Sequence, residues 1–207
     1  MSDTPIIHVV DDDESLRTAL LRLLAACGYD ARGYASAGDF LLHPHADLPG
    51  CLLLDLNMPG GPSGLELQAA LQRQGVHLPV IFLTGYGDIT SSVRALKAGA
   101  VDFLAKPVER EVLLEALQRA LALDAEGRSS REQLNDLRSR FASLTQREQE
   151  VFDRVVAGRI NKQIADDLAI CERTVKTMRA QLMVKLGAES VADFGRFAER
   201  MRQLSNP

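Results

Sequence analysis

Cysteine is scarce in this chain. Three cysteines, Cys27, Cys51 and Cys171, occur among 207 residues, and none belongs to a CxxC pair or to a Cys/His spacing typical of metal ligands. An odd number of widely separated cysteines does not support a disulfide scaffold. Buried free thiols in a reducing compartment are therefore the expected state of all three.

Long hydrophobic runs are absent as well. No apolar stretch approaches the roughly 20 residues that a membrane-spanning helix needs. The N-terminal sequence MSDTP has no basic residue, and it does not lead into the apolar core of a signal peptide. We therefore expect a cytoplasmic protein that has no membrane partner.

The chain also lacks an overall excess of basic residues. Its net charge is -4 and its pI is about 5.6, so total charge does not indicate nucleic-acid binding. The charges are unevenly distributed, however. Residues 1–121 contain 15 acidic and 9 basic side chains, whereas residues 144–207 contain 9 acidic and 11 basic ones. This asymmetry indicates two parts with different functions.

Short apolar runs alternate with helical patterns over residues 1–122, which we interpret as the first domain. The runs predict strands at 6–10, 31–35, 51–55, 79–84 and 101–105. The helical patterns lie at 15–27, 36–42, 64–74, 89–98 and 109–123. Strands that alternate with helices in this way predict an α/β domain, with a parallel sheet covered by helices on both faces. Ligand sites in such sheets lie at the carboxyl ends of the strands.

The rest of the chain shows only helical patterns. Residues 123–142 are polar and balanced in charge, and we interpret them as an interdomain linker that is partly helical. Residues 143–207 form the second domain, which is all-α and has four expected helices. Thr145 and Glu148 form a capping box at the start of its first helix. The second and third helices are joined by a short turn near 169–171, which matches a helix-turn-helix.

Charged and hydroxyl side chains follow the predicted strands of the first domain. Asp11 and Asp12 follow the first strand, Asp55 ends the third, Thr84 ends the fourth and Lys106 follows the fifth. Parallel strands would gather these groups at one edge, where a hard cation such as Mg²⁺ relieves repulsion between carboxylates. A lysine and a hydroxyl there suit the oxygens of a phosphoryl group. Asp55 is then the candidate nucleophile for phosphoryl transfer.

An aspartyl nucleophile on an α/β sheet also suggests a phosphatase of the haloacid dehalogenase type. Those enzymes carry the nucleophile after the first strand in a DxD motif, whose second aspartate is the acid or base. Here Asp55 follows the third strand, and Asn57 occupies the second position after it. Without an acid or base at that position, we expect only slow self-dephosphorylation rather than an enzyme that turns over substrate.

Four motifs of the first domain, HVVDDDES, LLLDLNMPG, FLTGYGD and VDFLAKP, resemble those of the receiver domain of two-component response regulators over residues 5–122. The resemblance implies a flavodoxin-like fold in which Asp55 is the phosphoacceptor. It also implies that Asp11, Asp12, Asp55 and the backbone carbonyl of Asn57 bind Mg²⁺ (or Mn²⁺). Further residues implied by the resemblance are Thr84 and Lys106, which would contact the phosphoryl oxygens.

The same resemblance bears on two further positions. Receiver domains usually have a cis peptide bond at the position of Lys106–Pro107, and proline makes the cis isomer accessible. They also often carry an aromatic residue at the position of Phe103 that moves inward together with the threonine, here Thr84, on activation. From the sequence alone, Phe103 remains open between this switch function and a plain core position.

The third helix of the second domain has a polar face that suits a DNA groove. Projected at 100° per residue, Val175, Met178, Leu182 and Leu186 form the inward stripe. Candidate DNA-contacting residues on and beside the opposite face are Arg173, Thr174, Lys176, Thr177, Arg179 and Ala180. Asn161 and Lys162, at the start of the second helix, are expected to meet DNA phosphates. Arg179 lies on the flank, where a structural ion pair is the alternative.

Residues 143–204 resemble the LuxR-type helix-turn-helix, and its fusion to a receiver through a linker is similar to the NarL/FixJ family. The receiver motifs resemble those of FixJ most. Two residues depart from the family pattern: Cys171 stands where a serine or threonine usually caps the third helix, and Met178 replaces a frequent histidine. We expect a weaker cap at Cys171 and simple packing of Met178.

The resemblance implies a signalling function. A sensor histidine kinase would phosphorylate Asp55, and the phosphorylated chain would form a homodimer, bind promoter DNA and act on RNA polymerase. One alternative is a C-terminal domain that binds RNA or another protein. A second alternative is a regulator that does not depend on phosphorylation, which the complete set of Asp11, Asp12 and Asp55 argues against.

Overall fold

The structure is a computed structural model that describes residues 4–43, 49–85 and 99–205. The chain divides into two compact units, residues 1–128 and 129–207. The division falls inside one long helix, α5 (Arg110–Ala142), so the residues expected to form the linker are helical throughout. None of the helices in the described ranges is both long enough and apolar enough to cross a membrane.

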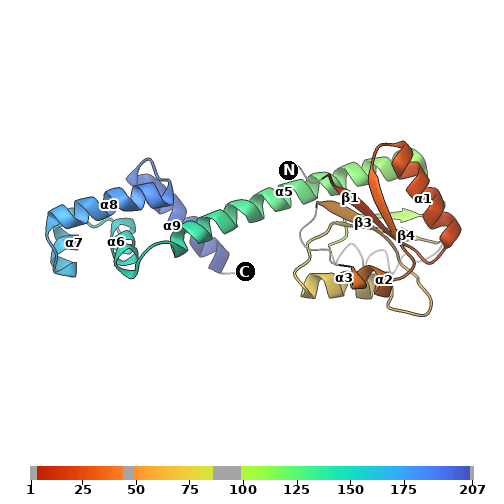
Figure 1. Ribbon diagram of the computed structural model, residues 1–207, viewed down its shortest axis with the longest axis horizontal. Helices are drawn as coiled ribbons and strands as arrows, with labels where there is room; N and C mark the ends of the chain where they lie inside the picture. Colours follow the sequence, from red (N-terminus) through yellow and green to blue (C-terminus); the bar gives the residue numbers. More distant parts are fainter. Residues whose placement is uncertain (1–3, 44–48, 86–98, 206–207) are drawn as a thin grey trace. The chain divides into compact units, whose positions relative to one another are not determined.

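The first unit is built on a parallel five-stranded sheet, with strand order β2-β1-β3-β4-β5 (Figure 1). The strands are β1 (Ile6–Val10), β2 (Asp30–Tyr34), β3 (Gly50–Asp55), β4 (Val80–Thr84) and β5 (Asp102–Ala105). All neighbouring strands pair in parallel. The expected α/β fold is therefore confirmed, and each strand agrees with its sequence-based range to within one residue at either end.

Helices cover both faces of this sheet (Figure 1). Leucines of α1 (Glu14–Ala26) and of α5 pack with one face, where Leu24 and Leu117 are fully buried. Side chains of α2 (Ala37–Leu42) and α3 (Gly64–Arg73), among them Phe40 and Leu67, pack with the other. The expected helix at 89–98 lies outside the described residues.

Helix α5 continues beyond the closing helix expected at 109–123, through a polar segment. Ion pairs at i,i+4 spacing stabilise the added turns, with Asp124–Arg128 at 2.9 Å and Asp136–Arg140 at 2.8 Å. Asp124 is buried, and its carboxylate also accepts a hydrogen bond from the backbone N–H of Gly50 at the start of β3.

The second unit has its own helical core. Its helices are α6 (Gln146–Val156), α7 (Asn161–Leu168), α8 (Glu172–Leu186) and α9 (Val191–Ser205). The capping box of Thr145 and Glu148 is present at the start of α6, and Lys185 of α8 pairs with the buried Glu148 at 2.7 Å. Helix α7 ends at Ala169 in the left-handed conformation, φ 52°, which turns the chain sharply into α8.

Gly50 provides a test of the tight pairing between β1 and β3. A Cβ atom at Gly50 would lie 2.0 Å from the carbonyl oxygen of Ile6, its partner in the sheet. We expect Gly50→Ala to lower the free energy of unfolding by about 2 kcal/mol or more, as measured by urea denaturation. Gly61→Ala is the control, because no atom lies within 4 Å of a Cβ there. Equal stability of the two variants would contradict this packing.

Candidate functional site: an acidic cluster and a helix-turn-helix

Two carboxylates lie side by side at the carboxyl edge of the sheet. Val10 of β1 pairs with Leu54 of β3, so Asp11 and Asp55 are the next residues along neighbouring strands. Both are buried, with 0% and 5% of their surface exposed. Asp12 is exposed, and carboxylate oxygens of Asp11, Asp12 and Asp55 all lie within 4.8 Å of one another. This set of hard oxygen donors suits a divalent cation such as Mg²⁺.

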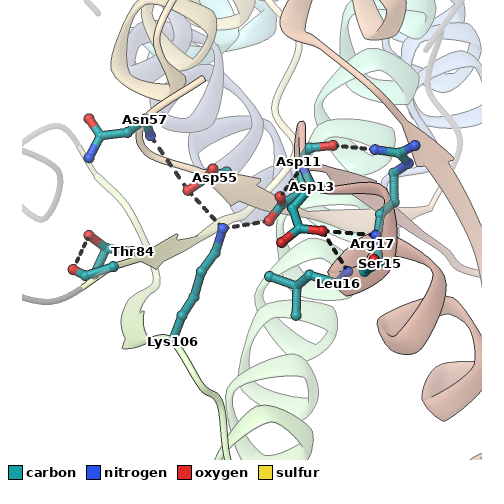
Figure 2. A network of polar contacts seen from close by, with 10 residues as sticks. Asp11, Asp13, Ser15, Leu16, Arg17, Asp55, Asn57, Thr84 and Lys106 are labelled. Carbon is teal, nitrogen blue, oxygen red and sulfur yellow. Dashed lines mark hydrogen bonds and ion pairs between the residues drawn. The ribbon is translucent and has the colours of Figure 1, made fainter. Parts of the chain in front are cut away.

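Lys106 links the two buried carboxylates (Figure 2). Its Nζ lies 2.7 Å from Asp11 Oδ2 and 3.1 Å from Asp55 Oδ1. Lys106 follows β5, two strands away from β3, and its backbone N–H donates to Thr84 O at 2.6 Å. The Lys106–Pro107 peptide bond is cis, as in the receiver domains that the motifs resemble.

Burial and neighbouring charges shift the pKa values of Asp55 and Lys106. Burial raises the pKa of Asp55 above its ordinary value, and the neighbouring Asp11 charge adds to the shift, while Lys106 opposes it. Burial alone would lower the pKa of Lys106, but its hydrogen bonds to Asp55 and Asp11 outweigh that effect and raise it. Lys106 is therefore a positive charge next to a carboxyl group that is costly to ionise.

The remaining residues predicted for this site differ in how closely they approach it. The backbone N–H of Asn57 lies 3.5 Å from Asp55 Oδ1. The Thr84 hydroxyl donates instead to the carbonyl of Gly85 at 3.0 Å and lies apart from the linked pair of carboxylates (Figure 2). Phe103 is half-buried and packs beside Phe82, with ring centroids 6.3 Å apart.

Two residues near the acidic cluster were missing from the sequence-based set. Asp13 is the N-cap of α1, where its carboxylate accepts from the backbone N–H groups of Ser15 and Leu16. Arg17, one turn into α1, donates from Nη1 to the carbonyl oxygen of Asp11 at 2.7 Å. The sequence signal for Arg17 was weak, since a single arginine early in a helix usually faces solvent.

In the second unit, α8 exposes the polar face expected from its sequence. Val175, Leu182 and Leu186 are buried, and Met178 packs against the same core, as expected. The exposed residues of the predicted DNA-binding face are Arg173, Thr174, Lys176, Thr177 and Ala180. Cys171 is the N-cap of α8 but forms no side-chain capping hydrogen bond, consistent with the weak cap expected.

The first turn of α7 is tied to α8. Arg179 is half-buried and donates from Nη1 to Asn161 Oδ1 at 2.6 Å. This bond uses a side-chain oxygen of one predicted DNA-contacting residue and a donor of another. Lys162, the next residue, is exposed.

Comparison with known proteins places both units in families. The response regulator receiver domain matches residues 7–118, and the luxR family of bacterial regulatory proteins matches residues 142–198. Nodulation protein W of Bradyrhizobium diazoefficiens is 41% identical over 200 residues, which are 97% of this chain and 88% of that protein. The transcriptional regulatory protein FixJ of Rhizobium meliloti is 40% identical over 192 residues, 93% of this chain and 94% of that protein.

The chain belongs to the response regulator family. Solved structures agree with this assignment. Response regulator StyR has a TM-score of 0.88 and 44% identity, covering 95% of this chain and 99% of that one. Full-length FixJ from B. japonicum has a TM-score of 0.59 and 35% identity, covering 96% and 98%. The resemblance drawn from the sequence motifs is thus confirmed, and the response regulator has a receiver domain and a LuxR-type DNA-binding domain.

The raised pKa of Asp55 predicts how the response regulator reacts to Asp55→Asn. The pKa of Asp55 is higher in the folded than in the unfolded chain. The stability that Asp55 contributes to the fold is therefore present below the ordinary carboxyl pKa, and it is lost as the pH rises through the folded-state pKa. Ionised Asp55 therefore destabilises the receiver at neutral pH. We expect Asp55→Asn to raise the urea midpoint at pH 7 in EDTA, with a smaller gain over wild type near pH 4. An unchanged or lower midpoint at pH 7 would contradict the burial argument.

Proposed function

We propose that Asp55 accepts a phosphoryl group from a sensor histidine kinase and that this phosphorylation controls binding of α8 to promoter DNA. The observation that supports it most is the position of Lys106 between Asp11 and Asp55 at the carboxyl edge of the sheet. In the transfer, an Asp55 oxygen forms a bond to phosphorus, and the bond from phosphorus to the kinase histidine breaks. Lys106 then faces the added negative charge.

We assign the divalent cation to the acidic side of the same site. Asp11, Asp12 and Asp55, with the backbone carbonyl of Asn57, would hold Mg²⁺ or Mn²⁺. A bound cation would supply positive charge that offsets the phosphoryl oxygens. The protein's own contribution is to hold the carboxylates close together and to keep Lys106 protonated beside them.

Thr84 and Phe103 are the proposed switch. The Thr84 hydroxyl is bonded to Gly85 O and is not directed at Asp55, so it must turn to meet a phosphoryl oxygen. Phe103 lies on the neighbouring strand β5, two residues before Ala105, which pairs with Thr84 in the sheet. A turn of Thr84 would leave space toward which the half-buried Phe103 ring can move.

The phosphoacceptor proposal is tested by phosphate incorporation. We expect wild-type protein to take up radiolabelled phosphate from acetyl phosphate in the presence of Mg²⁺, and Asp55→Asn to lose this label because the nucleophile is absent. Asp30→Asn is the matched control, since Asp30 is exposed at the start of β2 and should leave labelling intact. Label retained by Asp55→Asn at the wild-type level would exclude Asp55 as the acceptor.

We propose that DNA is contacted from two helices. Arg173, Lys176 and Thr177 of α8 would enter the major groove, with Thr174 and Ala180 beside them. The exposed Lys162 at the start of α7 would meet a phosphate. Asn161 and Arg179 bond to each other, so they join α7 to α8 and can still donate their remaining N–H groups to DNA.

A DNA-binding assay separates this proposal from a domain that binds RNA or protein. We expect Lys176→Ala to weaken specific DNA binding by about 10-fold or more in a gel-shift titration, because an exposed cation on the reading face is lost. Arg200→Ala also removes one exposed positive charge, but from α9, and should leave the affinity unchanged. Equal loss in both variants would indicate non-specific attraction, and no loss in Lys176→Ala would refute the assigned face.

Phosphorylated chains are proposed to pair, placing two helix-turn-helix units on one promoter, and to act there on RNA polymerase. The reason is that the second domain is small and carries little net charge, so a single copy offers few phosphate contacts. We propose that the dimer surface includes β5 together with the expected helix at 89–98, which lies outside the described residues.

A further inference from the structure

Arg17 holds the backbone at the end of β1. Its guanidinium donates to the carbonyl oxygen of Asp11 at 2.7 Å, and Figure 2 shows the side chain reaching from α1 to that oxygen. This carbonyl belongs to the peptide unit that joins Asp11 to Asp12. Arg17 thus bonds to the link between two proposed metal ligands without occupying an oxygen of either carboxylate.

A glycine in the neighbouring strand leaves room for the Arg17 side chain. Gly33 of β2 pairs with Val9 of β1, and a Cβ atom on it would lie 3.2 Å from both Cγ and Cδ of Arg17. The same Cβ would lie 2.9 Å from Leu21 Cδ1. Gly33 does not have a positive φ, so its backbone conformation does not require glycine. A Cβ atom at Gly33 would therefore press on the side chains of Arg17 and Leu21, and the glycine leaves room for both.

The other polar groups of Asp11 are already fixed. Its backbone N–H donates to Tyr34 O at 3.2 Å, and its carboxylate accepts from the N–H of Asp13 and from Lys106. Asp12 differs, because its side chain is exposed and its direction depends on the peptide that precedes it. The Arg17 bond fixes the carbonyl end of that peptide.

We propose that Arg17 is a positioning residue for the divalent cation, which orients the Asp11–Asp12 peptide so that both carboxylates face the same point. This inference rests on the proposed metal site. Two effects of the guanidinium act in opposite directions. Its hydrogen bond pre-orders the ligands and strengthens cation binding, whereas its positive charge repels the cation and weakens binding. If removing Arg17 weakens cation binding, its positioning effect is the larger one. If removing Arg17 strengthens cation binding, the repulsion by its charge is the larger one.

The direction of the change in Kd is measured by titrating the full chain with Mn²⁺. The electron paramagnetic resonance signal of free Mn²⁺ reports binding, and no phosphorylation is needed. Arg17→Met keeps the aliphatic stem and loses the hydrogen bond, so we expect the Kd for Mn²⁺ to rise roughly 10-fold. Arg17→Lys, which keeps a donor, should recover part of the affinity. Arg22→Met is the control, because Arg22 is exposed on the same helix, and its Kd should equal that of wild type.

Gly33→Ala tests the same bond from the opposite side. It leaves the Arg17 charge in the protein but crowds the stem of the side chain, so we expect it to weaken the hydrogen bond to Asp11 O and to raise the Kd as well. The double variant Arg17→Met/Gly33→Ala should bind no more weakly than the worse single variant, because both changes break one bond. Urea denaturation in EDTA checks that each variant is folded at the temperature of the titration.

The outcomes distinguish this inference from the proposed function. If wild-type protein binds no Mn²⁺, the metal site and the inference both fail. If wild type binds and Arg17→Met binds equally or more tightly, the metal site stands and the positioning role of Arg17 is refuted. If Arg17→Met is unfolded, the folded Gly33→Ala and Arg17→Lys variants decide, and wild-type Kd values in both refute the inference.

Discussion

The receiver site depends on two buried carboxylates that lie next to each other. Asp11 follows β1 and Asp55 ends β3, and the parallel pairing of these strands holds the two residues side by side. Like charges in a site of low solvent exposure repel strongly. Lys106 offsets this repulsion by bonding to both. The long reach of Lys106 across β4 is possible because its backbone is held to Thr84 at the end of that strand.

This arrangement explains why the site is suited to change state. Burial raises the pKa of Asp55, so the ionised carboxylate is held at a cost in stability, and groups that add positive charge reduce that cost. Lys106 supplies one such charge, and the proposed divalent cation would supply another. The proposed addition of a phosphoryl group would change the charge at this point, which would give the Thr84 hydroxyl a physical reason to leave Gly85 O and turn toward it.

Much of this site was predictable from the sequence, because strand ends of a parallel sheet meet at one edge whatever the details of packing. The sequence alone was enough to group Asp11, Asp55 and Lys106, because each stands at the end of an apolar run that predicts a strand. Their mutual distances agree with that grouping. The amphipathic stripe of α8 was equally plain, since Val175, Leu182 and Leu186 recur at helical spacing and are buried.

Other features depend on contacts between segments and left little trace in the sequence. Gly33 has no distinguishing feature in the sequence, and its closeness to Arg17 and Leu21 is visible only in the folded protein. Arg179 was placed on the flank of α8 by helical projection, but its bond to Asn161 depends on the turn at Ala169. The continuation of α5 through 124–142 was expected only in part, because ion pairs such as Asp136–Arg140 add small amounts of stability to each turn.

The central claim, that the state of Asp55 controls DNA binding, is tested most directly by fluorescence anisotropy on one promoter fragment. Wild-type protein is titrated with and without beryllium fluoride and Mg²⁺, which together mimic a phosphorylated aspartate, and Asp55→Asn is titrated under the same two conditions. We expect the mimic to tighten binding by wild type at least about 5-fold, a coupling of roughly 1 kcal/mol, and to have no effect on Asp55→Asn. Equal affinity of wild type in both conditions, or the same tightening in Asp55→Asn, would contradict it.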